Sequence, residues 1–178
     1  MFAKLVQSVE HSKPFDCKSL ANVLLDWAQL KQVSMSNMKL QKIVYFCHAD
    51  VLAATGRPLI DQTFEAWEYG PVIPSLYTEF KIFGAGPITG RATKFNPATC
   101  IREVASDCNL GGLEKIVSQS FERYVRYSAS ALSNLSHSEN GPWAAALARF
   151  ERGSHRGRNI ENELIERHHI HAYDRSLH

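Results

Sequence analysis

One continuous stretch of the chain decides the fold: residues 38–72, which read MKLQKIVYFCHADVLAATGRPLIDQTFEAWEYGPV. The first half places apolar side chains at three- and four-residue spacing, which is typical of a helix with one buried face. These side chains are Leu40, Ile43, Val44, Cys47 and Val51. Lys39, Lys42 and Asp50 are expected to lie off that face, and Gly56 suits a left-handed helix end.

The second half of the stretch has the pattern of a short strand. Residues 63–69 alternate and are rich in aromatic side chains. Gly70 and Pro71 are expected to end this strand, because proline has no amide hydrogen for the ladder. Residues 89–95 are a candidate second strand that pairs with the first. Two short strands alone are marginally stable, so we expect helices to pack against them.

Helical patterns predominate on both sides of this stretch. The expected helices begin near residues 19, 36, 74, 113, 128, 140 and 160, and the helix that begins near residue 113 is expected to be the longest. No internal repeat or low-complexity tract is visible. The sequence therefore predicts a mainly α, compact single domain over residues 1–178, with its core at roughly 20–168. It should contain six to seven helices and a small two-stranded β element.

The composition is that of an ordinary globular protein. Of 178 residues, 44% are apolar and 21% are charged, with a formal net charge of +2. The longest apolar runs, such as residues 144–148, are far shorter than the roughly 20 residues of a membrane span. The N-terminal segment shows no signal-peptide pattern. The four cysteines include no CxxC pair, so we expect reduced thiols and a cytoplasmic location.

No arrangement of residues predicts catalysis. Cys47 and His48 are adjacent, but neighbouring helix residues point about 100° apart, so adjacency does not make a dyad. A core cysteine beside a surface histidine is the simpler interpretation. Glu65 and Glu68 fall on opposite faces of the expected strand. His168 and His171 share a helical face, yet two imidazoles are too few for a stable zinc site. We therefore expect no enzyme activity, no cofactor and no metal.

Nucleic-acid binding is disfavoured but stays open. Four arginines gather near residues 149–158, yet glutamates interleave with them and cancel most of the positive field that a phosphate backbone requires. A solvated face of mixed charge is the simpler interpretation. Residues 26–41 could form two helices across a short break, which is the nearest candidate for a helix-turn-helix.

Aromatic side chains near turns are the strongest indication of a protein partner. Trp67, Tyr69, Tyr77 and Trp143 lie beside turn or polar residues. Exposed aromatic residues bury a large area on binding with little loss of entropy. Stabilisation of the Gly70–Pro71 turn is the competing interpretation for Tyr69 and Tyr77.

These segments together resemble the Panacea domain, the helical domain of many bacterial and prophage antitoxins, including SocA-like proteolytic adaptors. The residues that carry the resemblance include Leu40, Gln41, Tyr45, Gly56, Pro58, Trp67, Gly70, Pro71, His137 and Trp143. Ser136 stands where threonine is usual in the family, and the C-terminus lacks the expected paired tyrosines, with His168 and His169 there instead. The resemblance covers roughly residues 20–168.

The resemblance implies a protein-binding module without chemistry of its own. Our leading hypothesis is an antitoxin that binds and masks a toxin encoded nearby. Lys39, Lys42, Tyr69, Tyr77 and Lys81 are the candidate contacts, chosen as polar or aromatic residues off the expected core faces. The alternatives are an adaptor that delivers a toxin to a protease and a DNA-binding regulator of its own operon. A homodimer is compatible with each, and no membrane partner is expected.

Overall fold

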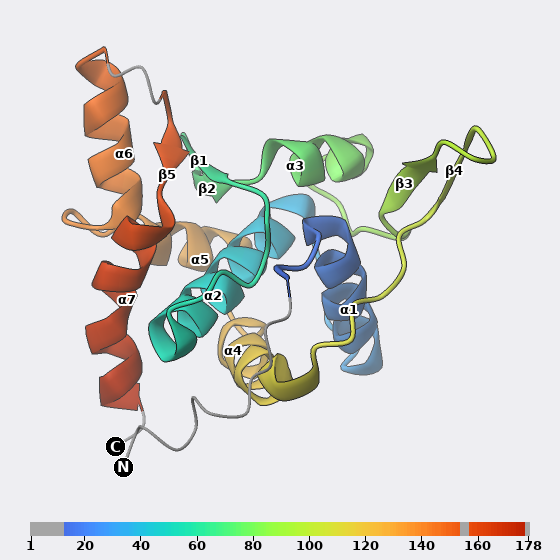
Figure 1. Ribbon diagram of the computed structural model, residues 1–178, viewed down its shortest axis with the longest axis horizontal. Coiled ribbons are helices and arrows are strands. Elements are labelled where there is room, and N and C mark those ends of the chain that lie inside the picture. Colours follow the sequence, from blue (N-terminus) through green and yellow to red (C-terminus); the bar gives the residue numbers. More distant parts are fainter. Residues whose placement is uncertain (1–12, 154–156, 177–178) are drawn as a thin grey trace.

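The computed structural model describes residues 13–153 and 157–176. In these residues the chain forms seven α-helices and two small sheets (Figure 1). The helices are α1 (Cys17–Leu30), α2 (Asn37–Thr55), α3 (Pro74–Phe80), α4 (Glu114–Tyr124), α5 (Ala129–Ser136), α6 (Pro142–Glu151) and α7 (Asn162–Ser176). The mainly α class with a minor β part is therefore confirmed.

Helix α2 lies at the centre of the molecule, with the other helices around it (Figure 1). The Ser36 hydroxyl accepts a hydrogen bond from the Lys39 amide at 3.3 Å and so caps the first turn, where the helix was expected to begin. Gly56 ends it in the left-handed conformation, also as predicted (φ +68°). Every residue from 40 to 52 is buried, since helices pack against α2 on all sides.

The prediction that α2 buries only one face is wrong. Lys42 and Asp50, which were expected off that face, are both buried, and so is His48. Asp50 lies 3.6 Å from the guanidinium of Arg123 on α4. Desolvation raises the pKa of the Asp50 carboxyl, and Arg123 opposes that rise. The apolar stripe marks only the most hydrophobic side of a helix that is enclosed all round.

The first sheet has the strand order β2-β1-β5. Its strands are β1 (Phe64–Trp67), β2 (Gly70–Val72) and β5 (Asn159–Ile160). The chain turns back after β1, so that Trp67 pairs with Gly70 and Ala66 with Pro71. The first strand therefore ends before Gly70 and Pro71, but these two residues begin the paired strand β2, which was not predicted. Proline is tolerated there because β2 is an edge strand, on which one side of the backbone needs no partner.

The second sheet is a separate hairpin of β3 (Thr93–Asn96) and β4 (Ile101–Val104). The predicted pairing of residues 89–95 with residues 63–69 is wrong, because β5 occupies the free edge of β1. The small β part therefore comprises five strands rather than two in the described residues. The hairpin projects from the body of the molecule beside α1 and α3 (Figure 1).

Helix boundaries follow local hydrogen bonds. The Asp16 carboxylate accepts a hydrogen bond from the Lys18 amide at 2.8 Å, so α1 begins at Cys17 rather than near Ser19. Ser128 caps α5, where a helix was expected to begin, because its hydroxyl accepts a 3.1 Å hydrogen bond from the Ala131 amide. Helix α2, with 19 residues, is longer than α4, with 11, so the prediction of the longest helix is wrong. No described helix has the length and hydropathy that a membrane span requires.

Candidate functional site

The turn between β1 and β2 is held by side chains from three helices. Three side chains donate to its backbone carbonyls: Trp143 Nε1 to Trp67 O at 2.7 Å, Ser133 Oγ to Tyr69 O at 2.9 Å and Lys42 Nζ to Pro71 O at 2.8 Å. The His137 ring lies between two carbonyls, with Nε2 3.1 Å from Glu68 O and Nδ1 2.6 Å from Ser133 O. Such hydrogen bonds contribute about 0.5–1.5 kcal/mol each to stability. The turn is therefore fixed in one conformation.

The helices supply these groups from one side of the turn. Lys42 lies in the second turn of α2, and Ser133 lies on α5. His137 is the C-cap of α5, and Trp143 lies in the first turn of α6. The His137 and Trp143 rings also contact each other edge to face, with centroids 4.1 Å apart. The residues that carry the family resemblance in the second half of the chain thus converge on one backbone turn.

Gly70 fits a space that no other residue can fill. Its φ is +98°, and a Cβ there would lie 2.4 Å from Ser136 Oγ and 3.1 Å from Lys42 Nζ. The Ser136 hydroxyl is held in place because it donates to Ser133 O at 2.7 Å. Both the backbone conformation and the close approach of α5 require glycine at this position.

Lys42 lies in the interior of the protein, so the prediction that it lies on the surface and contacts a partner is wrong. Its side chain is completely buried, and burial lowers its pKa to about 7. The carbonyl of Pro71 is its hydrogen-bond acceptor in the described residues. Lys42 therefore acts on the surface only through the turn that it holds.

The turn presents an exposed aromatic side chain at its tip. Tyr69 is 61% exposed, whereas the flanking Gly70 and Pro71 are buried. On the neighbouring α3, Tyr77 is exposed and its ring lies 5.0 Å from that of the half-buried Trp67. Trp67 Nε1 in turn donates to the Glu65 carboxylate at 2.8 Å.

The remaining lysine candidates differ in exposure. Lys81, which begins the short 3-10 helix η3 (Lys81–Phe83), is exposed. Lys39 is half-buried, and desolvation lowers its pKa. Four of the five residues predicted to contact a partner are thus at least partly accessible to solvent: Lys39, Tyr69, Tyr77 and Lys81.

The first half of the family pattern forms the interior. Leu40 and Tyr45 are core residues, and the Tyr45 hydroxyl lies 3.4 Å from His169 Nε2 on α7. Gln41 is buried and accepts a hydrogen bond from the Ile73 amide at 2.9 Å, which fixes the passage from β2 to α3. Gly56 ends α2, and Pro58 is half-buried in the following loop.

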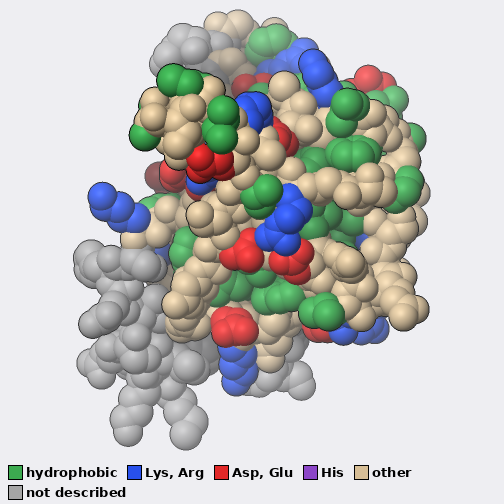
Figure 2. Space-filling model, turned by 90° about the vertical axis from the view of Figure 1, so that its right-hand side faces the viewer, with side chains coloured by type: hydrophobic (Ala, Val, Ile, Leu, Met, Phe, Trp, Pro, Cys, Tyr) green, Lys and Arg blue, Asp and Glu red, His purple; other side chains and the backbone are tan. Residues whose placement is uncertain are grey.

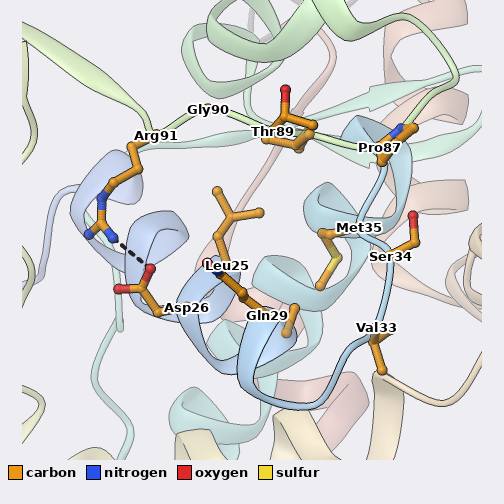
Figure 3. A pocket seen from close by; sticks show the side chains of 12 residues that line it. Leu25, Asp26, Gln29, Val33, Ser34, Met35, Pro87, Thr89, Gly90 and Arg91 are labelled. Atoms are coloured by element: carbon orange, nitrogen blue, oxygen red, sulfur yellow. Dashed lines mark hydrogen bonds and ion pairs between the residues drawn. The ribbon is translucent and has the colours of Figure 1, made fainter.

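A groove lies between α1 and residues 87–91, and sequence reasoning missed it. It has a volume of about 410 Å³, with Leu25, Met35 and Ile88 among its lining residues. Figure 3 shows Leu25 pointing toward the segment of residues 87–91, and Arg91 at one end in an ion pair with Asp26. Three separate segments contribute to it, so no local pattern could have revealed it.

The candidate catalytic groups do not assemble. Cys47 is buried, and burial raises the pKa of its thiol to about 12. His48 is buried rather than on the surface as expected, its Nε2 lies 3.0 Å from Asn162 Oδ1, and burial lowers its pKa to about 4. Among the described side chains no three metal-binding residues gather. The side chain of His171 lies outside the described residues.

The helix-turn-helix candidate, residues 26–41, lacks an exposed recognition helix in the described structure. A recognition helix needs an exposed face that enters a DNA groove, and α2 is enclosed by other helices from residue 40 to residue 52. Near the C-terminal arginines, Arg149 pairs with Glu161 at 2.9 Å and the Arg158 guanidinium lies over the Phe150 ring at 4.5 Å. Arg156 lies outside the described residues.

Comparison with known proteins identifies the family. Residues 40–144, more than half of the chain, match the family model for the SocA-like antitoxins, Panacea domain. The chain is 36% identical over 128 residues to Antitoxin SocA of Caulobacter vibrioides, which covers 72% of this chain and 68% of that protein. No solved structure matches. The chain belongs to the SocA-like antitoxin family, with a Panacea domain.

Proposed function

We propose that this protein is a cytoplasmic antitoxin of a bacterial or prophage toxin–antitoxin pair. It neutralises a toxin encoded beside it by binding that toxin directly and covering its active surface. Membership of the SocA-like family supports the antitoxin role, since the Caulobacter relative is named as one. The protein acts as one domain over residues 1–178, by binding rather than by catalysis.

The held β1–β2 turn is the observation that carries direct binding. Four side-chain groups fix its carbonyls, and the side chain at its tip, Tyr69, points to solvent. An aromatic side chain on a fixed backbone loses little conformational entropy on association, so more of its burial energy appears as affinity. Tyr77 and Lys81 on α3 and η3, with Lys39 on α2, are the further candidate contacts.

Co-expression tests the proposal. Growth should be restored when this chain is expressed with the toxin encoded by the neighbouring gene, and the two proteins should co-purify. Replacing Tyr69 and Tyr77 by alanine should weaken binding by about tenfold or more, as for aromatic residues at the centre of an interface. The control is Tyr127→Ala, which removes another exposed tyrosine, at the end of α4. Absence of both rescue and co-purification for the unmodified chain would refute the proposal.

Toxin turnover distinguishes masking from delivery to a protease. Direct masking leaves the half-life of the toxin unchanged or longer when this protein is present. A shortened half-life that depends on a cellular protease would assign the adaptor role instead.

A further inference from the structure

The β3–β4 hairpin contributes little to the core of the protein. All four residues of β4 are exposed, and β3 has no fully buried residue. The hairpin extends away from the helices at the right of Figure 1, with its tip at residues 97–100. Packing of the protein's own interior therefore does not explain this element.

Asn22 on α1 locks the base of the hairpin. Its completely buried side chain accepts a hydrogen bond from the Ala92 amide at 2.8 Å, and its amide nitrogen donates to Ala105 O at 2.9 Å and Ala92 O at 3.2 Å. The Ala105 amide also donates to Ala92 O at 2.9 Å. One side chain thus joins both strands where they leave the body.

Glu79 on α3 fixes the first residues of β3. It accepts hydrogen bonds from the Thr93 amide at 2.8 Å and from the Thr93 hydroxyl, Lys18 and Arg102, each at 2.6 Å. Burial alone would raise the pKa of Glu79, but these hydrogen bonds lower it to about 2. The hairpin is consequently held in place before any partner arrives, which reduces the entropy lost on binding.

Large apolar side chains lie on both faces of this rigid hairpin. Phe95 pairs with Arg102 and Asn96 with Ile101, so alternation places Phe95 and Ile101 on opposite faces. Phe95 is 60% exposed and Ile101 is 57% exposed. Val104 is also exposed and shares the face of Phe95. A flat partner surface would cover only one of these faces, whereas a concave one covers both.

The two positively charged side chains of the hairpin form ion pairs within the protein, whereas its carboxylate is hydrogen-bonded to neutral side chains. Lys94 lies 3.1 Å from Asp16, Arg102 binds Glu79, and Glu103 accepts hydrogen bonds from Asn96 and Thr99. Figure 2 views the molecule from this side and shows hydrophobic side chains spread over the face, with Lys and Arg lying directly against Asp and Glu near its centre. Such a surface offers no free positive field for nucleic acid and suits an apolar protein surface.

We propose that the β3–β4 hairpin is an arm that inserts into an apolar concavity of the cognate toxin, where Phe95 and Ile101 are buried on its two faces. This inference rests on the proposed antitoxin function, since it names a second part of the antitoxin that contacts the toxin, in addition to the β1–β2 turn. Burial of exposed aromatic and aliphatic side chains from a fixed hairpin supplies the affinity.

Affinity measurements with matched variants test the arm. The purified product of the neighbouring gene is titrated with the unmodified chain, Phe95→Ala, Ile101→Ala and the double variant. Each single change should weaken binding by about fivefold or more, and the double change by about twentyfold or more, as expected for anchor residues. The control combines Leu30→Ala and Tyr127→Ala, which removes two side chains that are 82% and 42% exposed on α1 and after α4. It should bind like the unmodified chain.

Each outcome separates the arm from the antitoxin role. If the unmodified chain fails to bind the toxin, the proposed function fails. If it binds and the double variant binds equally well, the arm proposal is overturned while the function stands. An effect of only one of the two single changes would overturn insertion into a concavity. The arm is also overturned if the double variant alters only the association of the chain with a second copy, measured by analytical ultracentrifugation.

Hydrogen exchange provides a readout that needs no variant. The amides of residues 93–104 should exchange more slowly in the complex with the toxin than in the free protein. Unchanged exchange in this segment, with slower exchange elsewhere in the chain, would contradict the arm proposal.

Discussion

Replacing Gly70 by alanine should destabilise the protein strongly, because two independent penalties act at one position. Alanine at a φ of +98° costs about 1–3 kcal/mol of backbone strain. The new Cβ would also lie 2.4 Å from Ser136 Oγ, so the hydroxyl must rotate away and lose its bond to Ser133 O. That hydrogen bond contributes about 1 kcal/mol. The free energy of unfolding should therefore fall by about 2–4 kcal/mol.

Urea unfolding of three variants separates the two penalties. Gly56→Ala is the control for the backbone, since Gly56 is left-handed (φ +68°) but a Cβ there meets only Glu166 Oε1 at an ordinary 3.7 Å. This control should lose about 1–2 kcal/mol. Gly70→Ala combined with Ser136→Ala should be less destabilised than the sum of the two single changes, because the clash is gone. A loss for Gly70→Ala no larger than that for Gly56→Ala, or strict additivity with Ser136→Ala, would refute the reasoning.

Three further predictions concern the buried groups of the same region. The pKa of Lys42 is about 7 in the folded protein, against an ordinary lysine pKa of 10.5, so the unfolded chain binds more protons between these pH values and stability rises with pH. Lys42 should raise the unfolding free energy by about 2 kcal/mol from pH 7 to pH 9, and Lys42→Met should abolish this rise. The same dependence of unfolding free energy on pH in Lys42→Met would contradict the lowered pKa of this buried amine. His48 has a folded pKa of about 4 against 6.5, so its stabilisation is lost as the pH falls through this window. Urea titrations should show that the unmodified chain loses about 2 kcal/mol more unfolding free energy between pH 7 and pH 5 than His48→Gln loses. Equal losses in the two proteins would count against this account. Trp143→Phe leaves Trp67 O without its donor and should cost about 1–2 kcal/mol, with faster amide exchange at Tyr69; unaltered exchange would show that the turn does not depend on this bond.

The local features of α2 could be predicted from the sequence, because they depend on neighbouring residues. Ser36 caps the helix through an amide three residues away, and Gly56 ends it through its own backbone freedom. The burial of Lys42 could not be predicted in this way. A lysine in a helical pattern is normally expected on the surface. The hydrogen-bond acceptor of Lys42 is the carbonyl of Pro71, which lies 29 residues later in the chain.

The candidate site depends almost entirely on long-range contacts. The side chains that contact the carbonyls of the β1–β2 turn come from residues 42, 133, 137 and 143, and nothing in their spacing shows that they meet. The resemblance to the family pointed to His137 and Trp143, but it did not say what they contact. Residues 159 and 160, which form β5, carry no strand pattern because two residues are too few to alternate. The strand predicted over residues 89–95 overlaps β3, but its partner β4 was missed because the two strands mix charged and apolar residues on both faces.

The central claim is that this protein neutralises a toxin by binding it directly. The most direct test is calorimetric titration of the purified chain into the purified product of the adjacent toxin gene, without a protease or DNA present. The account predicts a saturable complex with a dissociation constant in the submicromolar range, about −8 kcal/mol or tighter. A toxin that is folded and active but gives no binding heat and does not co-elute with the chain would contradict it.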